Sequence, residues 1–143
     1  ESQNTGHSGG VSIRKQNESI STMTEPDEVI ERMTGEALSI EINQQQTIAA
    51  ITHPEANLLT FWSIKDGAIL KAFGFEKPRG ISQTLDGKNF IVSYGIKPAM
   101  ANISTSDLTP QVDSIMQPTL ASGEHIVNWS QSLREIMPQR IYD

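Results

Sequence analysis

The sequence predicts an all-β protein, a partial β-propeller of about three four-stranded antiparallel blades with one short helix. Short apolar runs of about four to eight residues alternate with turn signals from residue 37 onward, which is typical of antiparallel strands. Residues 44–50 align with residues 86–92 at an offset of 42. A four-stranded unit that repeats every 40 to 45 residues or so is typical of a propeller blade. A β-sandwich, which also has short strands at regular spacing, is the alternative.

The N-terminal part predicts a flexible end followed by an incomplete blade. Residues 1–10 are polar and rich in glycine, as frayed ends are. Residues 11–15 and 19–23 are expected to be two strands, and residues 26–33 a short helix, because apolar residues recur there at helical spacing after two acidic ones. We therefore assign residues 11–34 to a partial blade with a short helix.

Residues 37–75 predict a complete blade. Its first strand alternates isoleucine and leucine with polar residues, which is the period of a half-buried strand. Pro54 interrupts the pattern, because proline cannot donate to a sheet ladder, and Asp66-Gly67 is a hairpin signal. The predicted strands are residues 37–43, 47–52, 58–64 and 68–75.

Residues 80–116 predict the next blade, and residues 125–143 a closing strand and tail. Residues 96–101 are expected to be a loop because they contain Pro98. The strand at residues 125–129 falls where the innermost strand of a further blade should begin. The predicted strands are residues 81–85, 90–94, 102–105, 111–116 and 125–129.

Composition excludes several classes of function. The 143 residues carry a net charge of −6 without a basic cluster, which argues against nucleic acid and anionic membrane surfaces as partners. No apolar run approaches the 18 or so residues of a membrane span. The absence of cysteine removes disulfides, zinc–thiolate sites and thiol catalysis. Because the chain does not begin with methionine, we expect it to be processed or truncated.

The blade period also predicts a partner. At 42 residues per blade, 143 residues hold about three blades, whereas propellers close with about four to eight. An open arc would leave two apolar blade faces in water. We expect these faces to be covered by missing N-terminal blades or by a second copy of the chain.

Four stretches of the chain resemble a bacterial exported β-propeller family of undefined function, whose relatives are YVTN-type and quinoprotein propellers with WD40-like repeats. The family pattern is a "G-x-x-SIA" strand, a "VAVTSPRGG" loop, a "VVWD..TG" hairpin and a final "WDNHL". Its counterparts here are residues 35–42, 49–57, 60–67 and 127–133. The resemblance spans residues 10–133 and corresponds to the C-terminal part of a family member.

The resemblance implies a cellular setting. Members of this family resemble periplasmic proteins exported by the Tat pathway, and they often lie beside imelysin-type iron-uptake genes. This implies a periplasmic location and an association with iron uptake. The family supplies no catalytic residues to carry over.

Several charged residues and histidines fall in loops that should meet on one face of a propeller. The loops between second and third strands, and those between blades, surround the channel in this fold, and such loops usually build the site. The sequence therefore suggests a mixed-charge pocket for a small anion, metal or peptide, with ordinary solvated loops as the alternative. The candidates are His7, His53, Glu55, Lys77, Arg79, Lys97, Glu124 and His125.

No motif predicts a cofactor, a metal site or a catalytic residue. The three histidines are not at a close ligand spacing, and no G-x-S-x-G elbow or recognisable carboxylate pair is present. We expect a non-catalytic cell-envelope propeller that binds a small ligand or protein partner. The alternative is a propeller enzyme of the oxidoreductase or lactonase type, with a metal or redox cofactor in its central channel.

Overall fold

The computed structural model describes residues 9–119, 123 and 125–128. Within them the chain forms ten strands and one helix, so the prediction of an all-β chain with one short helix is confirmed. The elements are β1 (Ser12–Ile13), β2 (Ser21–Thr22), α1 (Asp27–Ile30), β3 (Ser39–Ile42), β4 (Ile48–His53), β5 (Leu58–Ser63), β6 (Ile69–Gly74), β7 (Ile81–Gln83), β8 (Asn89–Tyr94), β9 (Ala99–Ser104) and β10 (Pro110–Met116).

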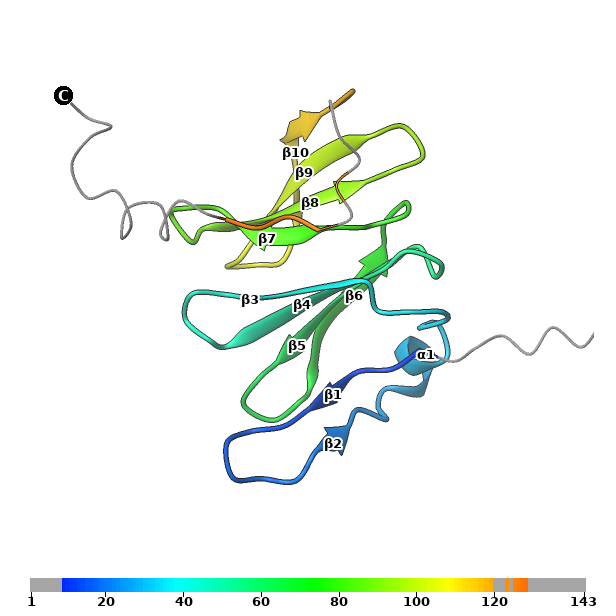
Figure 1. Cartoon of the computed structure of the whole chain (residues 1–143), viewed down its shortest axis with the longest axis vertical. Coiled ribbons are helices and arrows are strands. Elements are labelled where there is room, and N and C mark those ends of the chain that lie inside the picture. Colours follow the sequence, from blue (N-terminus) through cyan, green and yellow to red (C-terminus); the bar gives the residue numbers. More distant parts are fainter. Residues whose placement is uncertain (1–8, 120–122, 124, 129–143) are drawn as a thin grey trace, which may run out of the picture.

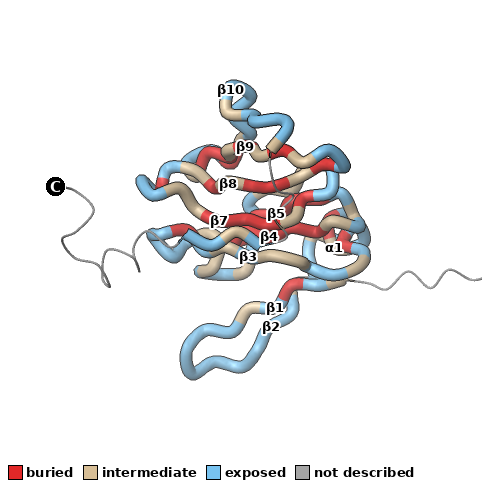
Figure 2. Tube along the Cα trace, turned by 45° about the horizontal axis from the view of Figure 1, so that its top comes forward, coloured by how far each residue is buried: buried red, intermediate tan, exposed pale blue. Residues whose placement is uncertain are grey.

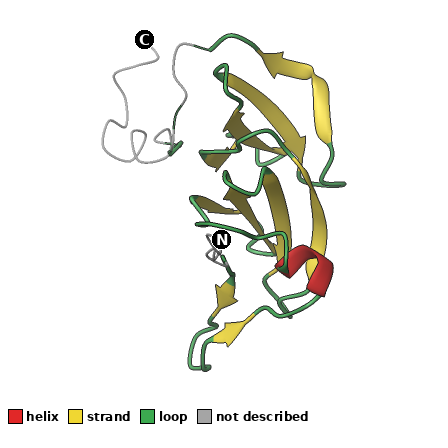
Figure 3. Ribbon diagram, turned by 90° about the vertical axis from the view of Figure 1, so that its right-hand side faces the viewer, coloured by secondary structure: helices red, strands yellow, loops and turns green. Residues whose placement is uncertain are grey.

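The strands form three antiparallel sheets that are stacked one on the next (Figures 1 and 3). The first sheet is the β1–β2 hairpin. The second has the order β3-β4-β5-β6, and the third has the order β7-β8-β9-β10. In both four-stranded sheets the chain enters at one edge and moves strand by strand to the other, so β3 and β7 occupy equivalent edges.

Apolar side chains fill the two spaces between these layers, and the buried residues run along β4, β5, β7 and β8 (Figure 2). Between the four-stranded sheets, the ring of Phe61 lies 5.8 Å from that of Phe73 and 5.8 Å from that of Phe90. On the other side of β3–β6, Trp62 packs in a cluster with Met33 and other residues of the N-terminal part. Each layer therefore depends on its neighbour for burial.

The two four-stranded sheets repeat at 41 residues, so the predicted offset of 42 is wrong by one. The β5–β6 and β9–β10 hairpins are equivalent, because Ala68 N donates to Asp66 Oδ1 at 3.2 Å and Thr109 N donates to Asp107 Oδ1 at 3.2 Å. The offset of 42 matched Gln44 with Asp86. The turn geometry instead matches Asp86 with the residue after Gln44, at an offset of 41.

Several predicted strand limits also differ from the structure. The strands predicted at residues 11–15 and 19–23 are shorter in the structure, where β1 and β2 have two residues each. Residues 99–101, which we expected in a loop, belong to β9, because Ala99 and Met100 pair with Tyr94 and Ser93 of β8. Residues 125–128 are not a strand in the structure, although they lie beside β7 (Figure 1).

Candidate functional site

The connections after β4, β6 and β8 lie together at one end of the stacked sheets, beside α1 (Figure 1). Hydrogen bonds join neighbouring loops to one another. Lys77 N donates to Asn57 Oδ1 at 3.0 Å, and Gly95 N donates to Glu76 O at 2.9 Å. These contacts hold the three connections together, so that they form one surface, which we call the loop end.

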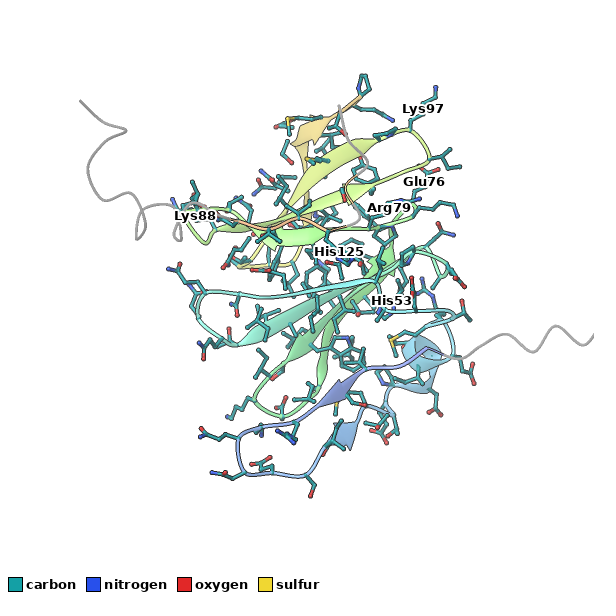
Figure 4. The ribbon with its side chains drawn as sticks, in the orientation of Figure 1. His53, Glu76, Arg79, Lys88, Lys97 and His125 are labelled. Carbon is teal, nitrogen blue, oxygen red and sulfur yellow. The ribbon has the colours of Figure 1, made fainter. Side chains whose placement is uncertain are left out.

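Four predicted site residues belong to the loops at this end. Glu55 follows β4, Lys77 and Arg79 follow β6, and Lys97 follows β8. Figure 4 shows Lys97 and Arg79 on the same side of the ribbon, with Glu76 between them. Glu55, Lys77 and Lys97 are exposed and Arg79 is half-buried, so the loop end presents charges of both signs. His7 and Glu124 lie outside the described residues.

His53 does not lie in a loop, contrary to our expectation. It is the last residue of β4 and is completely buried, because the strand continues up to the proline that comes next. Its Nε2 lies 3.0 Å from Thr60 Oγ1, and Trp62 Nε1 donates to the same oxygen at 2.8 Å. Burial lowers the pKa of His53 from 6.5 to about 4, because the cationic form would lose its hydration. His53 is therefore a neutral packing residue.

His125 lies in a segment that crosses the inner edge of the third sheet. Gly123 O accepts from Gly80 N at 3.2 Å and from Ser93 Oγ at 2.5 Å. Further along, Asn128 Nδ2 donates to Gln83 O at 3.3 Å. These contacts hold residues 125–128 alongside β7, running in the same direction, with the side chain of His125 exposed.

A groove of about 520 Å³ follows the inner edges of the sheets. Residues of three successive segments line it: residues 38–41, Ile81 with Ser82, and residues 125–128. We call it the inner-strand groove. Ile40 and Val127 are 59% and 69% exposed, which gives the groove apolar surface open to solvent.

The groove also carries ionisable groups. Glu41 and His125 both line it. Burial raises the pKa of the Glu41 carboxyl above its ordinary value. A surface of this kind can hold a partner with an apolar part and a hydrogen-bonding part.

The sequence-based candidates omitted most of this groove, because they were chosen from loops. Only His125 appears in both sets. A signal was available, since the first strand of each repeated unit forms the inner edge of a blade. The neighbouring isoleucine and glutamate in the first such strand, at Ile40 and Glu41, could have pointed to it.

In the part of the chain that the structure describes, no group of three or more histidine, aspartate or glutamate side chains could hold a metal ion. No helix of that part has the length and apolar character of a membrane span.

Two four-stranded antiparallel meanders, packed face to face and repeating at a fixed interval, define this chain as part of a β-propeller. The chain belongs to the family described as "Protein of unknown function (DUF1513)", whose model matches residues 2–129. No curated protein matches the sequence.

Solved structures with a similar fold include WD40 propellers. Sqt1 of Saccharomyces cerevisiae is 13% identical, with a TM-score of 0.50 over 65% of this chain and 22% of that one. The RRP9 WD40 repeats are 10% identical, with a TM-score of 0.49 over 65% and 27%. Hydrazine synthase of Kuenenia stuttgartiensis is 12% identical, with a TM-score of 0.48 over 52% and 22%. The chain thus spans between 22% and 27% of the length of these structures.

Proposed function

We propose that this chain is part of a non-catalytic, periplasmic β-propeller of the cell envelope that serves as a binding scaffold in a process linked to iron uptake. The observation that carries the binding role is the inner-strand groove, where exposed Ile40 and Val127 lie beside polar side chains. Exposed apolar residues gathered in a concave, partly polar site are typical of ligand and protein contacts. The periplasmic setting and the iron link rest on the family resemblance.

The binding role is tested by placing a charge in the groove. Ile40→Glu should weaken binding, because it puts a carboxylate on apolar contact surface already beside Glu41. Leu70→Glu is the matched control, since Leu70 is 47% exposed on the outermost strand of the same sheet and does not line the groove. Both variants should keep the wild-type melting temperature to within a few degrees, because both sites are exposed.

The readout is growth of a strain that lacks the gene, complemented with each variant, in medium depleted of iron by a chelator. We expect wild type and Leu70→Glu to restore growth and Ile40→Glu to fail. Equal restoration of growth by both variants would show that the binding surface lies outside the groove. If deletion of the gene has no effect at any iron level, the link to iron uptake is lost, while the binding role remains open to direct measurement.

A propeller enzyme with a metal or redox cofactor in its channel is the second candidate, and the shared position of Glu41 and His125 on the groove favours it. Elemental analysis and absorption spectra of the protein purified from its complete gene separate the two candidates. For a scaffold we expect metal well below one equivalent and no chromophore. One equivalent of iron or zinc that is lost in Glu41→Gln and in His125→Ala would support the enzyme.

A further inference from the structure

The inner-strand groove continues past Glu41 toward the turns that follow β3 and β7. A second groove, of about 510 Å³, lies there and shares Glu41 and Asn128 with the first as lining residues. The two grooves therefore meet at Glu41. The other residues that line the second groove are Ile42, Gln44, Gln83, Thr84 and Leu85.

Hydrogen bonds from the sheets hold the later walls of the groove in place. Thr52 Oγ1, on β4, donates to Arg79 O at 2.6 Å, two residues before β7 begins. Ser93 Oγ, on β8, makes the same kind of contact with Gly123 O at 2.5 Å, two residues before the segment 125–128. Because these walls are already in position, a ligand does not have to order them when it binds.

A single carboxylate carries the negative charge of this surface. Among the described residues that line the two grooves, Glu41 is the only carboxylate, none is lysine or arginine, and His125 is the other ionisable side chain. Glu41 is half-buried, and no described residue forms an ion pair with its carboxylate or donates a hydrogen bond to it. Such a carboxylate has lost part of its hydration, and a bound cation would compensate for that loss.

Apolar side chains open to solvent lie on both sides of Glu41. Ile40 and Val127 line the first groove, and Leu85, which is 64% exposed, lines the second. Successive side chains of a strand point to opposite faces, so a ligand that contacts both Ile40 and Glu41 lies along the open edge of β3. A ligand that matches this surface has one positive charge and an apolar stem.

We propose that the inner-strand groove binds an aliphatic primary amine in its ammonium form, with the ammonium on Glu41 and the stem against Ile40 and Val127. This assignment rests on the proposed binding role of the groove. An ammonium has three donors and no acceptor, which suits a carboxylate flanked by the amides of Gln44 and Asn128. Because Ile40 contacts the stem, the carboxylate of Ile40→Glu would lie against carbon and still weaken binding.

An ammonium fits this surface better than a metal ion does. The described residues offer no group of three or more histidine, aspartate or glutamate side chains around one point. A metal ion held by Glu41 alone would keep most of its water, and the apolar side chains beside it could not bind that water. An alkyl stem would instead bury those side chains.

The test uses three probes that share a six-carbon chain, which are hexylammonium, hexan-1-ol and hexanoate. They are titrated into the protein expressed from its complete gene with ¹³C-labelled isoleucine methyl groups, because Ile40 and Ile42 line the two grooves. We expect hexylammonium to bind at least about tenfold more tightly than hexan-1-ol, since hydrogen bonds between charged groups are the stronger ones. Hexanoate should cause no saturable shift of these methyl signals.

Glu41→Gln should reduce the affinity for hexylammonium to that for hexan-1-ol and leave the affinity for hexan-1-ol unchanged. Glu18→Gln is the matched control, because it removes the same charge from the exposed turn between β1 and β2. It should leave both affinities as they are in wild type. If Glu41→Gln does not fold, the comparison of the three probes on the wild-type protein decides.

Equal affinities of the wild-type protein for hexylammonium and hexan-1-ol would overturn the assignment of an amine. So would tighter binding of hexanoate, or an affinity for hexylammonium that Glu41→Gln does not change. In these cases the groove still binds a ligand, and the proposed binding role stands. If no probe shifts the methyl signals of Ile40 or Ile42, the amine is excluded, and growth of the strain that carries Ile40→Glu decides the binding role separately.

Discussion

The hydroxyl of Thr60 lies between two aromatic side chains in a fully buried position. Trp62 Nε1 can only donate, so the Thr60 oxygen accepts there, and His53 Nε2 completes the contact on the other side. Among the described residues, His53 Nδ1 has no hydrogen-bond partner. A proton added to His53 would therefore be stabilised neither by water nor by an acceptor, in agreement with its lowered pKa.

His53 should make the protein less stable in mild acid. Its pKa is 6.5 when unfolded and about 4 when folded, so the unfolded chain binds more protons between these values. The contribution of His53 is fully present above pH 6.5 and is lost as the pH falls toward 4. The loss amounts to about 3 kcal/mol over this range. Urea unfolding at several pH values measures it.

His53→Gln is the control for this prediction, because glutamine can still reach Thr60 and does not titrate. The difference in unfolding free energy between wild type and variant should change in favour of the variant as the pH falls. Other titrating groups, including Glu41, cancel in this difference. A difference that stays constant from pH 7 to pH 4.5 would show that the histidine is not buried as described.

Equivalent tight turns have different residues at the position that adopts a positive φ. Between β3 and β4, Gln46 has a φ of 55°, and the equivalent position between β7 and β8 is Gly87, with a φ of 69°. Side chains with a Cβ pay a steric penalty in this left-handed region, whereas glycine does not. The two blades therefore offer an internal comparison of one turn with and without strain.

Gln46→Gly should stabilise the protein by about 0.5–1 kcal/mol, because relief of the left-handed penalty exceeds the added freedom of the unfolded chain. Gln46 is exposed, so little packing is lost. The measurement is the midpoint of denaturant unfolding. Gly87→Gln is the reciprocal variant and should destabilise, since the φ of 69° at this position is strained for a residue with a Cβ. Stabilisation by both changes would contradict this account.

The turns also explain which elements the sequence could reveal. The hairpin at Asp66-Gly67 and the alternation in β3 could be predicted because each has a local chemical cause. The start of β9 was missed because Pro98 is a local signal for a loop, while pairing of Ala99 and Met100 with β8 comes from the fold. The predicted repeat was one residue too long, because glutamine at position 46, unlike glycine at position 87, does not indicate a residue with positive φ.

The sequence also predicts only one part of the candidate site. The loop end could be predicted, because alternate connections of a meander must lie together. The inner-strand groove could not, since it depends on how successive edges are placed side by side. His53 was expected at the loop end because a proline comes next in the sequence, whereas the strand continues right up to that proline.

At the scale of the whole molecule, stability depends on contacts between layers. Phe61 is completely buried between the four-stranded sheets, where its ring faces those of Phe73 and Phe90. Neither sheet can bury this surface alone. The two sheets should consequently unfold together in one transition.

Phe61→Ala should lower the unfolding free energy by about 3–5 kcal/mol, because it opens a cavity between the two sheets. Leu70→Ala, on the outermost strand β6, should cost less than about 1 kcal/mol, since Leu70 is 47% exposed. Thermal unfolding followed by near- and far-ultraviolet circular dichroism measures both. Two separate transitions in the wild type would show that the sheets are independent units.

The contact from Thr52 to Arg79, repeated from Ser93 to Gly123, makes the position of the next strand independent of the length of the connection before it. The two hydroxyls are 41 residues apart, whereas the carbonyls that they reach are 44 residues apart. Two of the three extra residues lie within β10, because Met116 pairs with Met100 as Phe73 pairs with Leu59. The third lies between Met116 and Gly123, and the chain still reaches the equivalent point. An insertion between Gln111 and Met116 can be absorbed as a longer bulge of β10 without shifting residues 125–128, which follow it. Genes that gain or lose codons at these places should therefore keep the same placement of successive sheets, so the outermost strand and the connection after it can diversify while the inner strands do not.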